Sequence, residues 1–472
     1  MIRLYSTLSR KKEELKPIHK DWIGLYTCGP TVYNFAHIGN LRTYIFEDIL
    51  QRTLEYNGYK VKRVMNVTDV GHLTSDADTG DDKLDKAAQA QKKSVQEIAK
   101  FHTNAFLDDL KKLNIEIPEI IAPASRYIPD QIAIIEKLVK KGVAYETSTA
   151  VYFDVSKFKD YGKLSGQSLA EKIKGARNEV ILDDKKHNAA DFALWFKLKG
   201  KFEHHLLRWP SPWGEGFPGW HIECSAISRH FLGQPFDIHT GGVDHIGTHH
   251  ENEIAQSEAA FGVPLANIWM HGEFLNINDG RMGKSEGNFI TLAELEKKGY
   301  HPLVFRYLVL EAHYRTKLNF TWETLDAAKN GLINLYNRSM ENIYDVKWQE
   351  ETNRRDDGLV WKEKFDKAIN DDLNVPKALG IVFEMLTDKK IKTEIKQNLL
   401  STFDKILGLN ILPQRTQAES IPPEIHEKAK QYQQLRDNKQ FVQSDALRKD
   451  IEALGYSIRD TEHGPYIVKK FF

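Results

Sequence analysis

A short stretch near the N-terminus, YTCGPTVYNFAHIGNLRTYIFEDIL, most restricts the folds available to this chain of 472 residues. The residues from Trp22 to Thr27 read as a buried strand that ends at a Cys-Gly-Pro turn. Apolar residues at helical spacing then predict a helix over Thr43–Asn57, and the β-branched content of KVKRVMNVTD predicts a second strand. Strand, helix and strand in this order form the first unit of a parallel sheet.

The predicted secondary structure changes several times along the remainder of the chain. Helical patterns cover Val95–Leu113 and Pro129–Lys141, whereas AYETSTAVYFDV and NEVILDD predict short strands in an insertion that extends to Leu207. FDIHTGGVD predicts a strand that leads into the helix HHENEIAQSEAAFG. The chain then becomes mostly helical from Pro302 to Leu409, followed by a linker, LPQRTQAESIPPE, and a helix pair with a small hairpin.

Composition excludes several classes of protein. Lysine plus arginine and aspartate plus glutamate both number 66, which argues against a protein that simply coats nucleic acid but allows local basic patches. No apolar run approaches the ~18 residues of a membrane span, and the N-terminal stretch lacks a signal-peptide pattern. With 2 cysteines, a disulfide framework is excluded. We expect a cytoplasmic protein without membrane contact, whose reduced thiols serve metal binding or catalysis.

The two cysteines and one helix supply candidate metal ligands. His249 and Glu253 are four residues apart, so on a helix they share one face and could bind one ion. Together with Cys28 and Cys224 they offer the thiolate, imidazole and carboxylate donors that zinc prefers. The alternative is two buried cysteines beside a charged helix start. His245 and His249 are also four apart, but the HExxH order of a metalloprotease is absent.

Two loops are candidate phosphate-binding sites. HIGN, from His37 to Asn40, opens the first predicted helix, and a helix N-terminus favours phosphate. DGRMGKSEGN is glycine-rich and basic, and its Lys284 and Ser285 could clamp phosphates as a mobile lid. It lacks the spacing of a P-loop. Taken singly, each loop could equally be an ordinary helix start or surface turn.

Taken together, HIGN and RMGKS around a parallel-sheet pattern resemble the HIGH and KMSKS signatures of class I aminoacyl-tRNA synthetases. The surrounding text is similar to the cysteinyl-tRNA synthetase family over nearly the whole chain, in the family's order. The stretches that carry this resemblance are YTCGPTVYNFAHIGN, NVTD, DFALW, WPSPWGEGFPGWHIECSA, FDIHTGG, HHENEIAQSEAA and DDLNVPKAL.

The resemblance implies an α/β fold with a Rossmann-like, doubly wound parallel sheet. The expected parts are the catalytic domain in two halves (1–143 and 207–265), an inserted subdomain (144–206), a lid and connecting subdomain (266–320), a helical bundle (321–412), a linker (413–423) and a C-terminal α+β piece (424–472). The last parts would bind the tRNA and read its anticodon. A monomer is expected.

The resemblance also implies roles for individual residues. One zinc ion would be held by Cys28, Cys224, His249 and Glu253, where it would select the thiol of L-cysteine over the serine hydroxyl. ATP with Mg²⁺ would contact His37, Gly39, Asn40, Gly241, Gly242, Asp244, Lys284 and Ser285, of which His37, Asn40 and Lys284 would be catalytic. Thr68, Trp220 and His239 would shape the cysteine pocket; a strand threonine, a structural tryptophan and a core histidine are the alternatives. The product would be cysteinyl-adenylate, then cysteinyl-tRNA(Cys).

The chain departs from the family text in four places. These are Arg281 and Gly283 in the lid, Asn40 in HIGN, a longer loop before Asp81, and His245 with Thr248 before the metal helix. Two alternatives stay open. One is a related ligase that joins cysteine to an amino sugar, which has little need of an anticodon-reading end. The other is a tRNA-binding paralogue without activity, which predicts a broken ligand set or a lost lid lysine.

Overall fold

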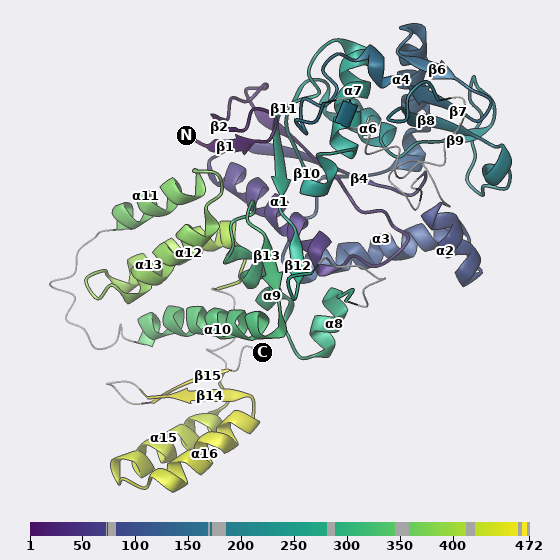
Figure 1. Cartoon of the computed structure of the whole chain (residues 1–472). Coiled ribbons are helices and arrows are strands. Elements are labelled where there is room, and N and C mark those ends of the chain that lie inside the picture. Colours follow the sequence, from purple (N-terminus) through teal and green to yellow (C-terminus); the bar gives the residue numbers. More distant parts are fainter. Residues whose placement is uncertain are drawn as a thin grey trace. The chain divides into compact units, whose positions relative to one another are not determined.

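The structure is a computed structural model of the chain (Figure 1) and describes residues 1–71, 73, 82–168, 170–171, 186–280, 288–344, 358–411, 421–460 and 465–469. It divides into two units, which we describe separately. Unit 1 comprises Met1–Glu294, Ala312–Thr321 and Ala368–Val375, and unit 2 comprises Leu295–Glu311, Trp322–Lys367 and Pro376–Phe472.

A five-stranded parallel sheet forms the centre of unit 1 (Figure 1). Its strand order is β11-β10-β3-β4-β5, with bounds β3 Trp22–Thr27, β4 Lys60–Val67, β5 Ile120–Pro123, β10 Phe236–Gly242 and β11 Ala266–Gly272. The chain starts in the middle at β3, adds β4 and β5 on one side, and later adds β10 and β11 on the other. This order confirms the predicted α/β fold and places the topological switch point between β3 and β10.

Six described helices flank these strands, and the sequence patterns predict all of them except those over Lys83–Gln91 and Ile222–Leu232. They are α1 Ile38–Tyr56, α2 Lys83–Gln91, α3 Val95–Lys112, α4 Ile128–Lys140, α6 Ile222–Leu232 and α7 His249–Phe261, with short 3₁₀ turns η1 Ala124–Tyr127 and η4 Val243–His245. Helix α1 begins at Ile38, which confirms that HIGN opens this helix, whereas the apolar pattern over Thr43–Asn57 covers only its later turns. His37 and Asn40 cap it reciprocally, so the HIGN segment is itself the first turn of the helix.

The insertion folds as a four-stranded antiparallel sheet in the order β6-β7-β8-β9. Its elements are β6 Ala144–Glu146, β7 Ala150–Phe153, β8 Phe192–Lys197 and β9 Gly216–Pro218, with η2 Val155–Lys157 and η3 Gly200–Phe202. Its core includes Trp195, Phe196 and Phe217, all nearly inaccessible to solvent. The predicted strand in NEVILDD lies outside the described residues.

Two short ribbons complete the described strands of unit 1. β1 (Arg3–Ser6) pairs antiparallel with β2 (Lys11–Glu14), and β12 (Leu275–Ile277) pairs parallel with β13 (Leu318–Phe320). Helix α8 spans Leu292–Lys297. Beneath the sheet, Arg63 on β4 and Glu47 on α1 form an ion pair at 3.1 Å, and their side chains are 1% and 0% exposed.

Unit 2 is helical, as predicted. Its helices are α9 Pro302–Leu310, α10 Trp322–Tyr344, most of α11 Gly358–Ile369, most of α12 Val375–Thr387, and α13 Thr393–Leu407. Phe365 stacks on Phe403 with ring centroids 3.9 Å apart, and the buried Arg306 donates to the carbonyl of Leu407 at 2.8 Å. These contacts join helices that are distant in the sequence.

The C-terminal piece contains the predicted helix pair and hairpin. They are α15 Pro423–Asp437, α16 Phe441–Ala453, and the antiparallel strands β14 Tyr456–Arg459 and β15 Tyr466–Lys469. A small core of its own includes Ile425, Tyr432 and Ile451. Most of the predicted linker lies outside the described residues. Helix α15 begins at Pro423, which is the last residue of the predicted linker.

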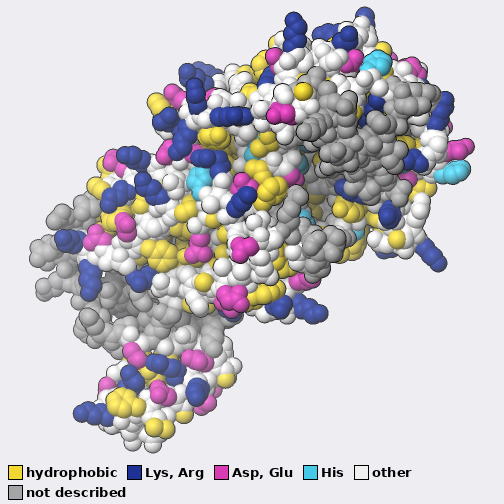
Figure 2. All heavy atoms as spheres, viewed as in Figure 1, with side chains coloured by type: hydrophobic (Ala, Val, Ile, Leu, Met, Phe, Trp, Pro, Cys, Tyr) yellow, Lys and Arg dark blue, Asp and Glu magenta, His cyan; other side chains and the backbone are white. Residues whose placement is uncertain are grey.

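The surface carries both signs of charge. Figure 2 shows lysine and arginine side chains interspersed with aspartate and glutamate over the visible face, in keeping with the equal totals of 66 each. Within the part of the chain that the structure describes, no helix combines the length and apolar character that crossing a bilayer requires.

Candidate active site and metal centre

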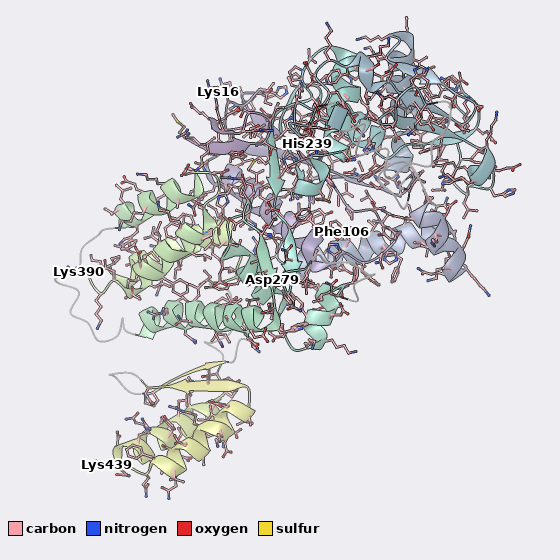
Figure 3. The ribbon with its side chains drawn as sticks, viewed as in Figure 1. Lys16, Phe106, His239, Asp279, Lys390 and Lys439 are labelled. Carbon is pink, nitrogen blue, oxygen red and sulfur yellow. The ribbon has the colours of Figure 1, made fainter. Side chains whose placement is uncertain are left out.

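The predicted site residues gather at the carboxyl ends of β3 and β10, at the switch point of the sheet. Cys28 directly follows β3, and Gly241 and Gly242 end β10. His239, which Figure 3 labels, lies on β10 two residues earlier and is fully buried. Open parallel sheets bind ligands in the crevice outside the carboxyl ends of the strands at the switch point, where the strand order reverses.

Four predicted metal ligands converge behind this edge. Cys28, Cys224 on α6, and His249 and Glu253 on α7 are all buried, and each contributes a donor atom within 4.8 Å of the other three. His249 Nε2 lies 3.0 Å from Glu253 Oε1, and Cys28 Sγ lies 4.0 Å from the same oxygen. Both thiols are free. Two thiols, an imidazole and a carboxylate are a donor set that suits tetrahedral Zn²⁺.

The electrostatics of the cluster favour the ligating forms of two donors. Burial alone would raise the pKa of Glu253, but His239 and His249 outweigh it and lower that pKa to about 2. Burial also opposes ionisation of Cys224, yet its contacts with Cys28 and His249 lower its pKa to about 6. Burial raises the pKa of Cys28. A carboxylate and a thiolate are therefore present near neutral pH, as metal binding requires.

A chain of hydrogen bonds approaches Cys28 from the far side. His250 Nε2 lies 3.2 Å from Cys28 Sγ, His250 Nδ1 lies 2.8 Å from His271 Nε2, and His271 Nδ1 lies 2.7 Å from the hydroxyl of Thr7. Burial lowers the pKa of both histidines well below its ordinary value, so each is neutral, with one donor and one acceptor nitrogen. Once Cys28 is the thiolate that metal binding requires, its sulfur can only accept, so the chain then runs from the Thr7 hydroxyl through both rings to Cys28.

Two further histidines orient the helix ligands. His239 Nε2 lies 2.9 Å from Glu253 Oε2, and His221 Nδ1 lies 3.0 Å from His249 Nδ1. A second group of donors, Cys28, His239, His250 and Glu253, is also close enough to hold an ion. We favour the first group, because His239 and His250 use the nitrogens that face Glu253 and Cys28 as donors to them.

The metal cluster opens into a cavity of about 310 Å³. Nine predicted site residues line it: Cys28, His37, Asn40, Thr68, Trp220, Gly241, Gly242, Asp244 and His249. Gly39, Cys224, His239 and Glu253 do not line it; the last three lie behind the wall that Cys28 and His249 form. Lys284 and Ser285, with the departures Arg281 and Gly283, lie outside the described residues. One cavity thus joins the HIGN helix start to the metal cluster.

The start of α1 presents donors to this cavity. His37 Nδ1 accepts from the backbone N–H of Asn40 at 3.1 Å, and Asn40 Oδ1 accepts from that of His37 at 3.2 Å. The cap thus fixes the imidazole proton on Nε2. Burial lowers the pKa of His37, so it is a neutral donor at neutral pH. The ring also meets Phe289 edge-on at 5.4 Å.

The predicted cysteine-pocket residues occupy different positions. Trp220 stacks on His249 with centroids 4.4 Å apart, while His239 lies in the second layer against Glu253. The hydroxyl of Thr68 donates to Glu223, which also accepts from Asn66 at 2.9 Å. His245 lies at the cavity wall, with its ring 5.0 Å from that of His249.

Sequence reasoning missed His221, Glu223 and His271, and it considered His250 only as a candidate metal ligand, not as a partner of Cys28. His221 and Glu223 stand in the quoted GWHIECSA segment, and His250 stands beside His249. The sequence could have indicated His271 only through its place near the end of a strand. In the structure, β11 pairs with β10 in a register that sets His271 opposite Gly241.

Comparison with known proteins places the chain. The family model for the class I tRNA synthetase (C) catalytic domain matches residues 14–330, and the DALR domain model matches residues 364–411. The chain is 42% identical to a cysteine–tRNA ligase of Treponema denticola over 97% of its length and 98% of the relative. It is 44% identical to cysteine–tRNA ligase 1 of Burkholderia lata, covering 98% and 96%.

Solved structures agree on the fold. A methionyl-tRNA synthetase of Mycobacterium tuberculosis in complex with methionyl-adenylate matches with a TM-score of 0.57 at 16% identity, covering 83% of this chain and 91% of that one. A LeuRS–tRNA–LeuAMS complex from Agrobacterium radiobacter K84 matches with a TM-score of 0.60 at 10% identity, covering 85% of each chain. With its near-complete relatives and its catalytic-domain match, this chain belongs to the cysteine–tRNA ligase family of class I aminoacyl-tRNA synthetases.

Proposed function

We propose that this chain activates L-cysteine with Mg²⁺-ATP to cysteinyl-adenylate and transfers the cysteinyl group to the 3′-terminal adenosine of tRNA(Cys). The supporting observation is the single cavity that both the capped helix start and the metal cluster line. A thiol bound at Cys28 and His249 and a triphosphate bound at His37 and Asn40 would share this space. The carboxylate of cysteine would then meet the α-phosphorus without a protein nucleophile.

The metal cluster would provide the choice of amino acid. Cys28, Cys224, His249 and Glu253 would hold Zn²⁺, which when bound supplies a site with affinity for a thiolate and little for a hydroxyl. His250 and His239 hold Cys28 and Glu253 in place through their hydrogen bonds. Trp220 covers His249 on the cavity side. An apolar pocket could not separate cysteine from serine as strongly, because their sizes and shapes are so close.

The phosphates would be bound by fixed donors. Nε2 of His37 and the amide of Asn40 stand at the N-terminus of α1, where the helix dipole also favours negative charge. Gly241, Gly242 and Asp244 line the same cavity and would face the nucleotide. We also assign phosphate contacts to Gly39, Lys284 and Ser285, the last two in the lid. Charge stabilisation by such preorganised groups would carry the chemical step.

We assign the tRNA to the remaining parts. The helical region at 321–412 would lie along the tRNA, and the piece at 424–472 would read the anticodon. The match of residues 364–411 to the DALR domain lies within the first of these two regions. We further propose that the protein acts as a monomer in the cytoplasm, which equilibrium sedimentation and cell fractionation would test.

Cysteine-dependent ATP–pyrophosphate exchange, with serine as the competing substrate and zinc measured on the same sample, tests the activation step. We expect exchange with cysteine and none with serine. Cys224→Ser should lose both the zinc of this cluster and the exchange, whereas Ser228→Ala, one turn later on α6, should keep both. Zinc without any exchange would refute the synthetase activity for this chain.

Charging assays separate this proposal from its nearest alternative. A ligase that joins cysteine to an amino sugar would show the same exchange but would not charge tRNA. The relatives at 42% and 44% identity that extend over nearly the full chain are named cysteine–tRNA ligases, which favours tRNA as the acceptor. Transfer of labelled cysteine to tRNA(Cys) but not to the sugar is the expected result.

A further inference from the structure

A second cluster of potential metal ligands lies outside the cavity described above. Asp82 caps the N-terminus of α2, Asp85 stands in its first turn, and His205 follows η3 in the inserted subdomain. Their exposed fractions are 4%, 8% and 4%, so the two segments bury all three side chains between them. Potential donor atoms of the three lie within 4.8 Å of one another.

Backbone contacts already use one side of each residue. Asp82 Oδ1 accepts from the N–H groups of Leu84 and Asp85, and Asp85 Oδ2 accepts from that of Leu206 at 3.0 Å. His205 Nδ1 lies 2.6 Å from the carbonyl oxygen of Leu207, which can only accept, so this nitrogen carries the ring proton. These bonds fix the orientation of the three side chains.

The opposite side of each residue is left without a hydrogen-bond partner. Asp82 Oδ2, Asp85 Oδ1 and His205 Nε2 are buried atoms with none. His205 Nε2 lies 3.4 Å from Asp82 Oδ2 and 3.8 Å from Asp85 Oδ2. Acceptors that face one another in a buried space repel, so this arrangement calls for a cation between them.

Among the residues that the structure describes, Arg208 does not supply that cation. Burial raises the pKa of Asp85, and the Leu206 N–H, His205 and Arg208 lower it less, but the hydrogen bonds of Arg208 go to the backbone oxygen of His205 at 3.1 and 2.7 Å. On its other face the His205 ring stacks on Phe217 at 3.7 Å. The two carboxylates together carry two negative charges, which one divalent ion would balance.

We propose that Asp82, Asp85 and His205 bind one divalent transition-metal ion, with Zn²⁺ as the best fit, in a site separate from the cysteine cluster. Bonds of about 2.0–2.1 Å place tetrahedral ligands about 3.3 Å apart, close to the separations of 3.4 and 3.8 Å between His205 and the two carboxylates. Calcium prefers six to eight oxygen ligands, whereas this site offers three protein donors and one is a nitrogen.

Such an ion would fasten the inserted subdomain to the parallel-sheet domain. Asp82 and Asp85 belong to the start of α2, which follows β4, and His205 belongs to the insertion. Beside the site, Leu84 of α2 belongs to a small apolar cluster against which Leu207 packs. The ion would add a fixed tie to this modest apolar contact.

To test the proposal, the full-length protein is loaded with zinc and dialysed exhaustively, and its metal content is then measured. We expect the zinc content to fall by one ion per chain in His205→Phe, which keeps the stack on Phe217, and in Asp82→Asn, which keeps the helix cap. His204→Gln, exposed and adjacent, should retain the wild-type content. Equal zinc in wild type and both site variants would overturn the proposal and leave a protonated His205 between the carboxylates.

Two further readouts separate this site from the cysteine cluster. In a Cys224→Ser background, added zinc should raise the unfolding temperature, and His205→Phe should abolish that rise. With cobalt in place of zinc, ions at this site should lack the thiolate charge-transfer band that the cysteine cluster gives. No zinc-dependent rise in the Cys224→Ser background would refute the second site, whatever the outcome of the exchange assay.

Discussion

Gly29 offers a sharp test of the geometry of the metal cluster. It follows Cys28 at the end of β3, and its N–H donates to the side chain of Asn66 at 2.8 Å. A Cβ at this position would lie 1.7 Å from the backbone oxygen of Asn66 and 2.9 Å from Met65 Cγ. The nearest atom is backbone in the neighbouring strand β4, so no side-chain rotation can relieve the contact.

The size of the expected effect follows from these distances. Ordinary contact begins near 3.4 Å, so Gly29→Ala must separate the ends of β3 and β4 by about 1.7 Å more. Metal sites tolerate ligand displacements of only about 0.2 Å, and Cys28 is the adjacent residue. We expect zinc affinity at the cysteine cluster to fall by at least about 100-fold. The overpacking itself should destabilise the fold by about 1–3 kcal/mol.

Competition for zinc with a chromophoric chelator measures the affinity, and thermal unfolding measures the stability. Gly247→Ala is the matched control, since a Cβ there meets nothing within 4 Å. The control should retain wild-type zinc affinity and cysteine-dependent exchange. Gly29→Ala protein that is folded, binds zinc as tightly as wild type and exchanges at the same rate would refute the reasoning.

Further substitutions test the helix cap at His37, the buried ion pair of Arg63 and the histidine that contacts His249. His37→Ala should lose about 1 kcal/mol of helix-cap stability and also lower pyrophosphate exchange, whereas His37→Asn should keep the cap and lose only exchange. Because burial lowers the pKa of His37, its contribution to stability is present above about pH 6.5 and is lost as the pH falls below that value, which urea unfolding at several pH values would show. Arg63→Met should destabilise the fold by about 3–5 kcal/mol by leaving Glu47 buried without its partner, and adding Glu47→Gln should recover part of this in the urea midpoint. His221→Phe should weaken zinc binding about 10–100-fold in chelator competition, because His249 loses the partner of its Nδ1.

Much of this architecture could be predicted from local patterns. The strand before Cys28 and the helices over Val95–Leu113 and Pro129–Lys141 were predicted to within a residue or two, because apolar spacing and glycine stops mark their ends. The metal quartet could also be proposed in advance. With so few thiols in the chain, the i, i+4 pair on a helix left few other combinations of soft donors.

Other features depend on contacts that local patterns do not contain. The apolar pattern of α1 begins only at Thr43, because the first turn of the helix is a capping box formed by a histidine and an asparagine, in place of the usual serine or threonine with glutamate. The hydrogen bond between His250 and His271 depends on how α7 packs beside β11, which local sequence patterns do not specify. The pairing of Thr68 with Glu223 joins residues 155 positions apart. Only the assembled sheet brings such residues together.

The number of histidines around the cysteines has a physical explanation in charge balance. Two thiolates and a carboxylate exceed the charge of one divalent ion, and burial makes the excess negative charge costly. Cationic partners would compete with the ion, whereas neutral imidazoles stabilise the ligands as donors without adding charge. His250 does so for Cys28, and burial lowers its pKa, which maintains the neutral form that this role requires. His239 donates to Glu253 at 2.9 Å. The position of His250 also explains, on steric grounds, why residue 241 is a glycine. A Cβ at Gly241 would lie 2.7 Å from the rings of both His245 and His250 and would push His250 away from Cys28.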